Sequence, residues 1–195
     1  MTLIFATNNQ HKVDEIRNVL GQNLEIITLK EAGFDVDIPE PYDTLDANAS
    51  GKSAFIYELT GTTSFSEDTG LEVAALNGEP GVKSARYAGE DRSFDANIEK
   101  LLSNLAGKDD RSARFRTVIS LLIDGRETQF EGICNGKIIS EKRGTQGFGY
   151  DPVFIPEGSD RTFAEMSLTE KNQYSHRKKA TEKLVAFLNK LSTNH

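Results

Sequence analysis

Hydrophobic positions along the first 30 residues change from a continuous run to helical spacing and then to alternation. Residues 2–7 form a short apolar run that ends in polar residues, which is typical of a buried strand. Val13, Ile16 and Leu20 then recur at helical spacing, so the pattern predicts a strand, a polar turn and a helix. Residues 24–29 alternate as a second strand would.

The rest of the chain continues this mixture of helices and strands. It predicts helices over residues 46–59 and 93–105, a C-terminal helix whose apolar stripe spans residues 180–191, and strands over residues 62–66, 114–123, 127–134 and 153–155. Gly61 is expected to close the first of these helices, and Asp124-Gly125 is expected to form a hairpin turn. Because helices alternate with strands at both ends around a central hairpin, the pattern favours an α/β fold with a mixed β-sheet flanked by helices. We find no linker or repeat, so residues 1–195 are expected to form a single domain.

Composition restricts the classes of partner. The 195 residues include 23 Lys+Arg and 30 Asp+Glu, which gives a net charge of −7 and disfavours binding to a nucleic-acid polymer. No apolar run approaches the roughly 20 residues of a membrane span, so no membrane contact is expected. The single Cys134 allows no internal disulfide and suits a reducing cytoplasm. An acidic chain can still bind a small polyanion if its few cations converge or a metal ion intervenes.

The predicted turn between the first strand and helix is the first candidate site. Such a turn directs backbone N–H groups and the positive end of a helix at one point, which suits an anion. Lys12 adds a positive charge there. Capping of the helix by Asn8 or Asn9 is an equally concrete interpretation. The residues concerned are Thr7, Asn8, Asn9, Gln10, His11 and Lys12.

Two adjacent carboxylates, Glu67 and Asp68, follow the predicted strand over residues 62–66, and Glu40 and Glu72 add further acidic side chains. Carboxylates at a strand end can hold a hard cation such as Mg²⁺ through oxygen ligands. The alternative is a polar turn in which Gly70 takes a positive φ.

A glycine-rich segment with two aromatic residues, Gly147-Phe148-Gly149-Tyr150, is the third candidate. Glycines let a backbone approach a ligand closely, and an aromatic ring offers a stacking face. The spacing fits neither a dinucleotide-binding nor a Walker motif. A hairpin with core aromatics is the alternative, and Phe148 is the stronger candidate for ligand contact because Tyr150 could equally brace the loop.

A cationic run begins the last predicted helix. Ser175 is a good N-cap, so His176 and Arg177 would lie in the first turn, where the helix dipole disfavours positive charge unless an anion or a base edge is present. We interpret Lys178 and Lys179 as a solvated face. Upstream, residues 167–170 match a capping box, which predicts a short helical turn at Lys171.

Taken together, these segments closely resemble the inosine triphosphate pyrophosphatase family, which removes non-standard purine nucleoside triphosphates. The resemblance covers nearly the whole chain, although Thr69 stands where Ser is common. The matching segments are, in order, 7–15 (Thr7, Asn9, Lys12 and Glu15), 38–40 (Ile38-Pro39-Glu40), 48–52, 67–73, 78–87, 147–152 and 163–177.

The resemblance implies hydrolysis between the α and β phosphates of ITP, dITP or XTP with Mg²⁺ as cofactor, in a two-lobed homodimer whose nucleotide site lies in the cleft between the lobes. Glu40 and Asp68 would bind the metal, with Glu67 as an auxiliary group, and Asp68 would also activate water. Lys12, Lys52 and the backbone of residues 7–11 would bind the triphosphate.

The same resemblance implies the residues that recognise the nucleoside. Phe148, beside Gly149 and Tyr150, would stack on the purine, and Thr69 would contribute a hydroxyl contact. A donor such as Arg177 would pair with the 6-keto group and be left unpaired against adenine. The residues that would contact the base, the sugar or nearby phosphates are Asp151, Lys171, His176 and Arg177.

Three other functions remain open at this point. A related pyrophosphatase of the septum-inhibitor type would act on modified pyrimidine triphosphates. A nucleotide-sensing module would bind without turnover. An RNA-binding protein would use Phe148, Tyr150 and the basic run at residues 176–179, with steep salt dependence.

Overall fold

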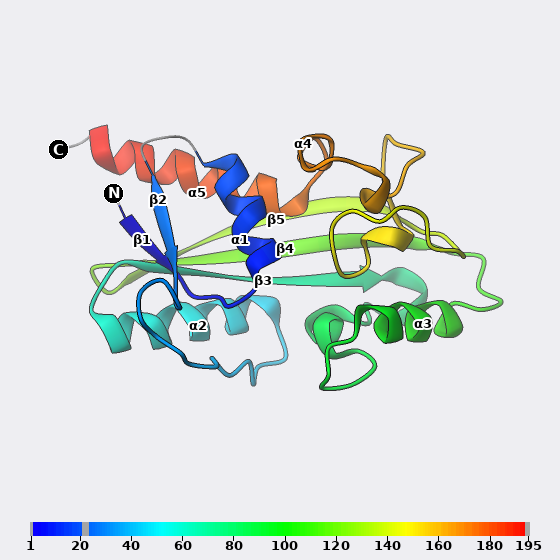
Figure 1. The fold of residues 1–195 in the computed structure, drawn as a ribbon, viewed down its shortest axis with the longest axis horizontal. Coiled ribbons are helices and arrows are strands. Elements are labelled where there is room, and N and C mark those ends of the chain that lie inside the picture. The colour runs from blue at the N-terminus through cyan, green and yellow to red at the C-terminus, as the bar shows by residue number, and fades with distance from the viewer. Residues whose placement is uncertain (1, 21–23, 194–195) are drawn as a thin grey trace. The chain divides into compact units, whose positions relative to one another are not determined.

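The structure, a computed structural model, describes residues 2–20 and 24–193 and contains an α/β arrangement of strands and helices (Figure 1). The strands are β1 (Thr2–Phe5), β2 (Glu25–Thr28), β3 (Ser64–Val73), β4 (Ser112–Ile123), β5 (Arg126–Ile138) and β6 (Phe154–Pro156). The helices are α1 (Gln10–Val19), α2 (Leu45–Thr60), α3 (Phe94–Asn104), α4 (Leu168–Lys171) and α5 (His176–Thr193).

The strands form one six-stranded sheet in the order β2-β1-β3-β4-β5-β6. β1 is parallel to both β2 and β3, whereas β5 and β6 are antiparallel. The sheet is therefore mixed, which confirms the predicted fold class. Among the described residues, no helix combines the length and the apolar character that crossing a membrane requires.

The chain divides into two compact units, as the two-lobed prediction requires. Unit 1 comprises residues 1–68, 117–132 and 177–195, and unit 2 comprises residues 69–116 and 133–176. Placement of a nucleotide in a cleft between lobes stays a prediction.

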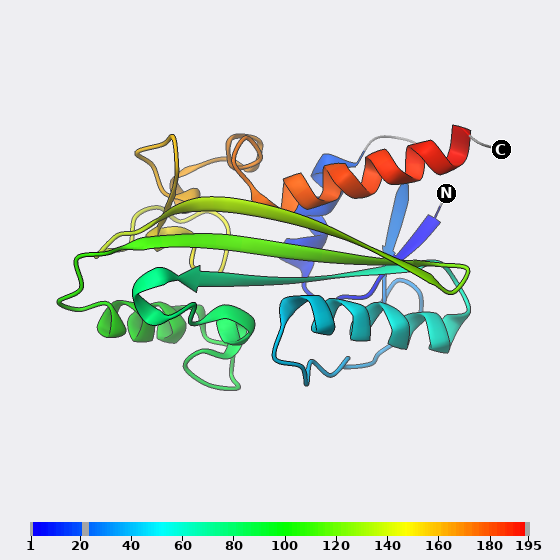
Figure 2. The same cartoon turned by 180° about the vertical axis from the view of Figure 1, so that it is seen from behind.

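Unit 1 has two hydrophobic cores on opposite faces of its strands. Leu3 and Phe5 of β1 pack with residues of α1 and α5, such as Ile16 and Leu184. Ile4, which points to the other face, packs with residues of α2. Figures 1 and 2 show α1 and α5 over one face of these strands and α2 over the other.

Unit 2 is built around a single core. Ile98 and Leu101 of α3 share it with Phe115 of β4, Phe154 of β6 and Phe163. The rings of Phe115 and Phe154 meet edge to face with centroids 4.6 Å apart. Aromatic packing thus anchors the segment that follows β5 onto the sheet.

Ser93, expected as the first residue of a helix over 93–105, is instead the N-cap of α3 and accepts a hydrogen bond from Ala96 N at 3.2 Å. Two local predictions are confirmed. Gly61 ends α2 in the left-handed region, with φ 63°. The hairpin between β4 and β5 turns at Asp124 (φ 49°) and Gly125 (φ 72°), as expected for a two-residue turn.

The prediction for residues 67–70 is wrong. These residues were expected to follow a strand that ends at Ser66, with a turn at a positive-φ Gly70 as the alternative interpretation, but β3 continues through Gly70 to Val73. Among the described residues, β1 pairs with β3 only at Ser64 and Phe65, so the rest of the strand continues along its other neighbour, β4. Its two carboxylates remain buried because basic side chains pair with them.

Candidate active site

The turn before α1 is organised by side chains that cap the helix. The Asn9 side chain accepts a hydrogen bond from Lys12 N at 3.3 Å, and Thr7 Oγ1 accepts one from Asn9 N at 3.1 Å. Asn8 Nδ2 donates to Val36 O at 3.0 Å. Asn9 is therefore the N-cap, which confirms the capping interpretation, while a role in anion binding stays a prediction.

Gln10 and His11, the next two predicted residues, are exposed at the start of α1, whereas Lys12 is not. Gln10 Nε2 donates to Asp14 Oδ1 at 2.7 Å, and His11 is exposed. Lys12 is half-buried and reaches the sheet, where it meets Glu67.

Glu67 on β3 faces α1 and α5. Lys12 Nζ lies 2.5 Å from Glu67 Oε1, and Arg177 Nη2 lies 3.5 Å from Glu67 Oε2. Arg177 also pairs with Glu15 of α1. The side chain of Glu67 is fully buried and that of Arg177 is only 2% exposed, so these contacts form a buried ion-pair network.

Asp68 faces α2, because successive side chains of a strand point to opposite faces. Its Oδ1 atom lies 3.6 Å from Lys52 Nζ. The same ammonium donates to Glu40 Oε1 at 2.6 Å and to the backbone oxygen of Glu67 at 2.8 Å. Lys52 thus brings Glu40 and Asp68 to one point.

The two neighbouring acids of β3 have opposite electrostatic environments. Burial acts to raise the pKa of Glu67, but the charges of Arg177 and Lys12 outweigh it and hold that pKa well below its usual range. Burial raises the pKa of Asp68 to about 6, although the charge of Lys52 acts to lower it. The nearby carboxylates of Glu40 and Glu67 also raise this pKa. A pair of acids with separated pKa values is the arrangement by which a site assigns different roles to similar groups.

The donor set suits a magnesium ion that the substrate helps to hold. In the part of the chain that the structure describes, no group of three or more His, Cys, Asp or Glu residues is arranged to hold a metal ion. Mg²⁺ in enzymes is commonly bound by one or two carboxylates, with water and substrate phosphates at its remaining positions. Glu40 and Asp68, which meet at Lys52, are the two carboxylates that could form such a pair, whereas Glu72 pairs with Arg114, whose Nε lies 2.6 Å from Glu72 Oε2.

The glycine-rich loop of unit 2 closes around Asp151. Asp151 Oδ2 accepts hydrogen bonds from Phe148 N at 3.1 Å and from Lys171 Nζ at 2.8 Å. Both members of the Lys171–Asp151 pair have side chains only 4% exposed. Gly147 has φ +73°, and a Cβ at that position would overlap Asp151 Oδ2. The glycine is required for the loop to approach its own carboxylate.

Aromatic rings lie close to Lys171 and His176 in unit 2. Lys171 Nζ lies 5.2 Å from the ring centroids of both Phe148 and Phe163. The ring of His176 stacks on Phe115 with centroids 4.6 Å apart and planes at 15°. Phe148 itself is half-buried, so part of it meets solvent. A loop of this composition can present an aromatic face beside an ammonium group.

Tyr150 braces this loop. Its hydroxyl donates to Ser84 O at 2.6 Å, and only 5% of the residue is exposed. Burial, with the nearby Tyr87 hydroxyl, raises the pKa of Tyr150 above its ordinary value. Gly149 has φ +58°, and Thr69 is half-buried on β3. Of the two aromatics, Phe148 is the one exposed enough to contact a ligand.

The basic run at residues 176–179 is not a continuous surface. His176 and Arg177 are each 2% exposed, and Lys178 pairs with Glu182 at 3.2 Å. An extended nucleic-acid surface at this position is therefore disfavoured, because the first two residues of the run lie inside the protein.

Glu15 is a member of the buried ion-pair network and was given no role from the sequence, although it lies in the matching segment 7–15. It is 6% exposed and binds Arg177 across 162 positions of sequence. The available signal was its spacing, since Glu15 lies three residues after Lys12 and therefore on the same side of α1. The rings of Phe115 and Phe163 were also missed, and nothing in their local sequence distinguishes them from core residues.

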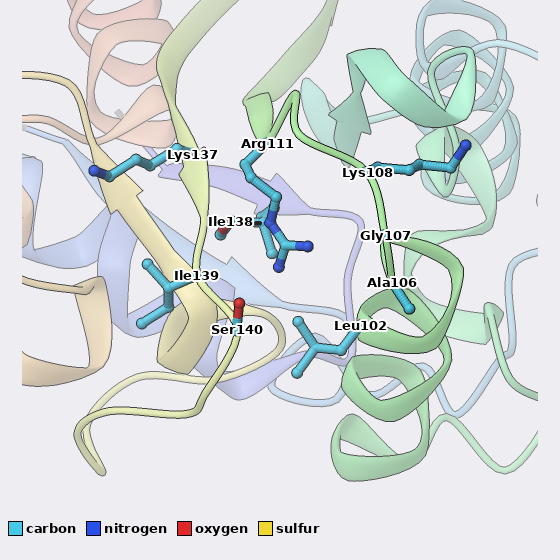
Figure 3. A pocket seen from close by; sticks show the side chains of 9 residues that line it. All are labelled: Leu102, Ala106, Gly107, Lys108, Arg111, Lys137, Ile138, Ile139 and Ser140. Atoms are coloured by element: carbon cyan, nitrogen blue, oxygen red, sulfur yellow. Dashed lines mark hydrogen bonds between the residues drawn. The ribbon is translucent and has the colours of Figure 1, made fainter.

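A hollow of about 610 Å³ in unit 2 is separate from these residues (Figure 3). Arg111 lies at its centre, where Nε donates to Ile138 O at 3.0 Å and Nη1 donates to Leu105 O at 3.1 Å. The guanidinium thus satisfies a carbonyl at the end of α3. None of the site residues predicted from the sequence lines this hollow.

The chain is similar to known proteins along nearly its whole length. Residues 3–187 match the model of the Ham1 family. The chain is 54% identical to a Porphyromonas gingivalis protein over 95% of this chain and 96% of that protein, and 48% identical to a Christiangramia forsetii protein over 97% and 100%. Both relatives are named dITP/XTP pyrophosphatase.

Solved structures of similar proteins share the fold. The Staphylococcus aureus Ham1 protein is 42% identical, with a TM-score of 0.88 over 97% of this chain and 98% of that one. A HAM1 protein from Coxiella burnetii is 36% identical, with a TM-score of 0.89 over 97% and 99%. Since the family match spans nearly the whole chain, the resemblance inferred from its motifs is confirmed, and this chain belongs to the Ham1 family.

Proposed function

We propose that this enzyme hydrolyses the non-standard purine nucleoside triphosphates ITP, dITP and XTP to the nucleoside monophosphate and pyrophosphate, with Mg²⁺. The observation that carries the proposal is the arrangement on β3, where Glu67 and Asp68 meet separate basic partners. Relatives named dITP/XTP pyrophosphatase support the substrate class.

The charges of the buried ion pairs around β3 support binding of the substrate as a complex with a metal ion. Three cations, Lys12, Lys52 and Arg177, contact four carboxylates. The set therefore carries one excess negative charge when all members are ionised. A bare triphosphate would be repelled by that excess, whereas a divalent cation satisfies both the carboxylates and the phosphate oxygens. The carboxylates in question are Glu15, Glu40, Glu67 and Asp68.

In the proposed reaction, Asp68 accepts a proton from a water molecule while the oxygen of that water molecule attacks the α phosphorus. The bond from that phosphorus to the bridging oxygen then breaks, and pyrophosphate leaves. Mg²⁺, held by Glu40 and Asp68, would supply positive charge to the phosphate oxygens and make water easier to deprotonate. Lys12 and Lys52 would stabilise the charge that develops on the leaving pyrophosphate.

Residues of unit 2 would recognise the nucleoside. We propose that Phe148 stacks on the purine and that the Lys171 ammonium, oriented by Asp151, donates to an acceptor on the base edge. Hypoxanthine and xanthine have a keto acceptor where adenine has an amino donor, so a buried donor would discriminate against ATP. Gly149, His176 and Thr69 complete the proposed contacts. Arg177, which was expected to donate to this keto group, instead pairs with Glu15 and Glu67.

A product assay tests reaction, substrate and cleavage position together. Pyrophosphate and orthophosphate release is measured with ITP, XTP, dITP, ATP, GTP, dTTP and UTP at equal concentrations. We expect pyrophosphate release from the first three, abolished by chelation of Mg²⁺ and restored by adding it back. Comparable rates with all substrates would contradict the selectivity, and faster turnover of the pyrimidines would favour the septum-inhibitor type. Binding without any product would indicate a sensing module.

Substitution of the proposed base gives a sharper test. Asp68→Asn retains the shape of the side chain and is expected to lower kcat by at least about a hundredfold, in line with the contribution of a general base. Glu72→Gln removes a carboxylate from the same strand that pairs with Arg114, and it should retain activity. Normal turnover by Asp68→Asn would exclude Asp68 as the base.

We further propose a cytoplasmic homodimer, as the family resemblance implies. Sedimentation equilibrium measures the state directly, and a monomer at micromolar concentration would contradict this proposal.

A further inference from the structure

Phe94, the first residue of α3, is a large aromatic side chain that remains 44% exposed. The side chain of Ser93 caps the helix start and so fixes the backbone beside Phe94. Single exposed apolar side chains are common on protein surfaces, so the neighbours of this ring decide whether it has a role.

The ring of Phe94 lies beside that of Phe148. Their centroids are 6.2 Å apart and their planes are inclined at 52°. This distance is within the range of interacting aromatic pairs. Together the two rings form an angled aromatic surface within unit 2, and the Lys171 ammonium lies over the Phe148 ring, 5.2 Å from its centroid.

We propose that Phe94 is a specificity-determining residue that extends the base-stacking surface of Phe148 so that it matches a fused two-ring purine. The inference rests on the proposed function, because it takes Phe148 as the base-stacking residue. A one-ring pyrimidine stacked on Phe148 is covered by that ring alone. A purine extends beyond it, and its overhanging ring then meets Phe94. The second aromatic residue thus favours purines whatever groups the base edge carries.

The experiment compares Phe94→Ala and Phe94→Leu with the unchanged enzyme. Stacking on an aromatic residue contributes enough to binding for its removal to lower kcat/KM for ITP about tenfold. The change is expected as a higher KM at nearly constant kcat, because the base is bound equally in the ground and transition states. Competitive inhibition by inorganic tripolyphosphate, which has no base, should not change. The UTP rate, measured with enough enzyme to follow it, should fall less than the ITP rate.

Controls separate direct contact with the base from support of Phe148. Phe94→Leu keeps an apolar side chain against Phe148 but has no aromatic face, so it should resemble Phe94→Ala, whereas Phe94→Trp should retain a low KM for ITP. Leu59→Ala removes another exposed apolar side chain, 47% exposed on α2, and should leave all constants unchanged.

Recovery of the ITP constants in Phe94→Leu, an unchanged KM for ITP in Phe94→Ala, or an equal weakening of tripolyphosphate inhibition would overturn the inference. Each of these outcomes presupposes that the unchanged enzyme releases pyrophosphate from ITP. Absence of that release would instead refute the proposed function.

Discussion

Gly147 tests whether the loop around Asp151 is built as described. Gly147→Ala introduces two costs. The first is the left-handed conformation at φ +73°, which costs a residue with a Cβ about 1–2 kcal/mol. The second is the overlap of the new Cβ with Asp151 Oδ2, which forces the carboxylate away from Phe148 N and Lys171 Nζ.

The second cost follows from the contacts that the carboxylate would lose. A hydrogen bond to a charged group contributes about 1.5–3 kcal/mol, so loss of one of the two contacts together with the conformational cost should lower the unfolding free energy of Gly147→Ala by about 2.5–5 kcal/mol. Gly107 is a matched control, because it has φ +74° but no atom within 4 Å of an added Cβ. Gly107→Ala should therefore lose only the conformational cost of about 1–2 kcal/mol.

Urea unfolding of the two variants measures the difference. The KM for ITP should also rise in Gly147→Ala alone, because the loop carries Phe148. Equal losses of unfolding free energy in the two variants would refute the reasoning, since they would show that the contact with Asp151 imposes no constraint.

Two further predictions concern residues outside the reaction centre. Tyr150→Phe removes the donor to Ser84 O and should lower the unfolding free energy by about 1–2 kcal/mol with little change in the KM for ITP, which thermal unfolding and steady-state kinetics measure together. Burial acts to raise the pKa of Glu127, but hydrogen bonds from Ser50 and Ser120 outweigh it and lower that pKa. Its contribution to stability is therefore present above its unfolded pKa and is lost as pH falls through the folded pKa. Glu127 is exposed, so Glu127→Gln should cost less than about 1 kcal/mol at pH 7 and less at pH 3 than at pH 7, as urea unfolding at both pH values would show.

The parts of the fold that sequence predicted well are those that short-range rules determine. Asn9 before α1, and Ser167 with Glu170 around α4, are capping signals that the structure reproduces. The Asp124-Gly125 turn follows in the same way from the positive φ that both residues tolerate.

Long-range pairing explains what sequence could not predict. Glu67 and Asp68 look like turn residues because isolated charges do not enter a buried strand. Only their partners, brought from α1, α2 and α5, make that burial acceptable. For the same reason, the motif residue Glu15 could be recognised as part of a pattern, but its contact with Arg177 could not be predicted.

The alternation of Glu67 and Asp68 on β3 makes the site sensitive to insertions and deletions. One extra residue between Phe65 and Glu67 would shift the strand by one position and exchange the two carboxylates between faces. Glu67, which Arg177 and Lys12 keep ionised, would then lie on the face of Lys52, and Asp68 would lie on the face of Arg177 but two positions beyond the present place of Glu67. Every residue needed for the chemistry would still be present in such a chain, but each of the two carboxylates would lie on the wrong face of the sheet. The length of this strand segment is therefore as much a part of the site as the identity of its side chains.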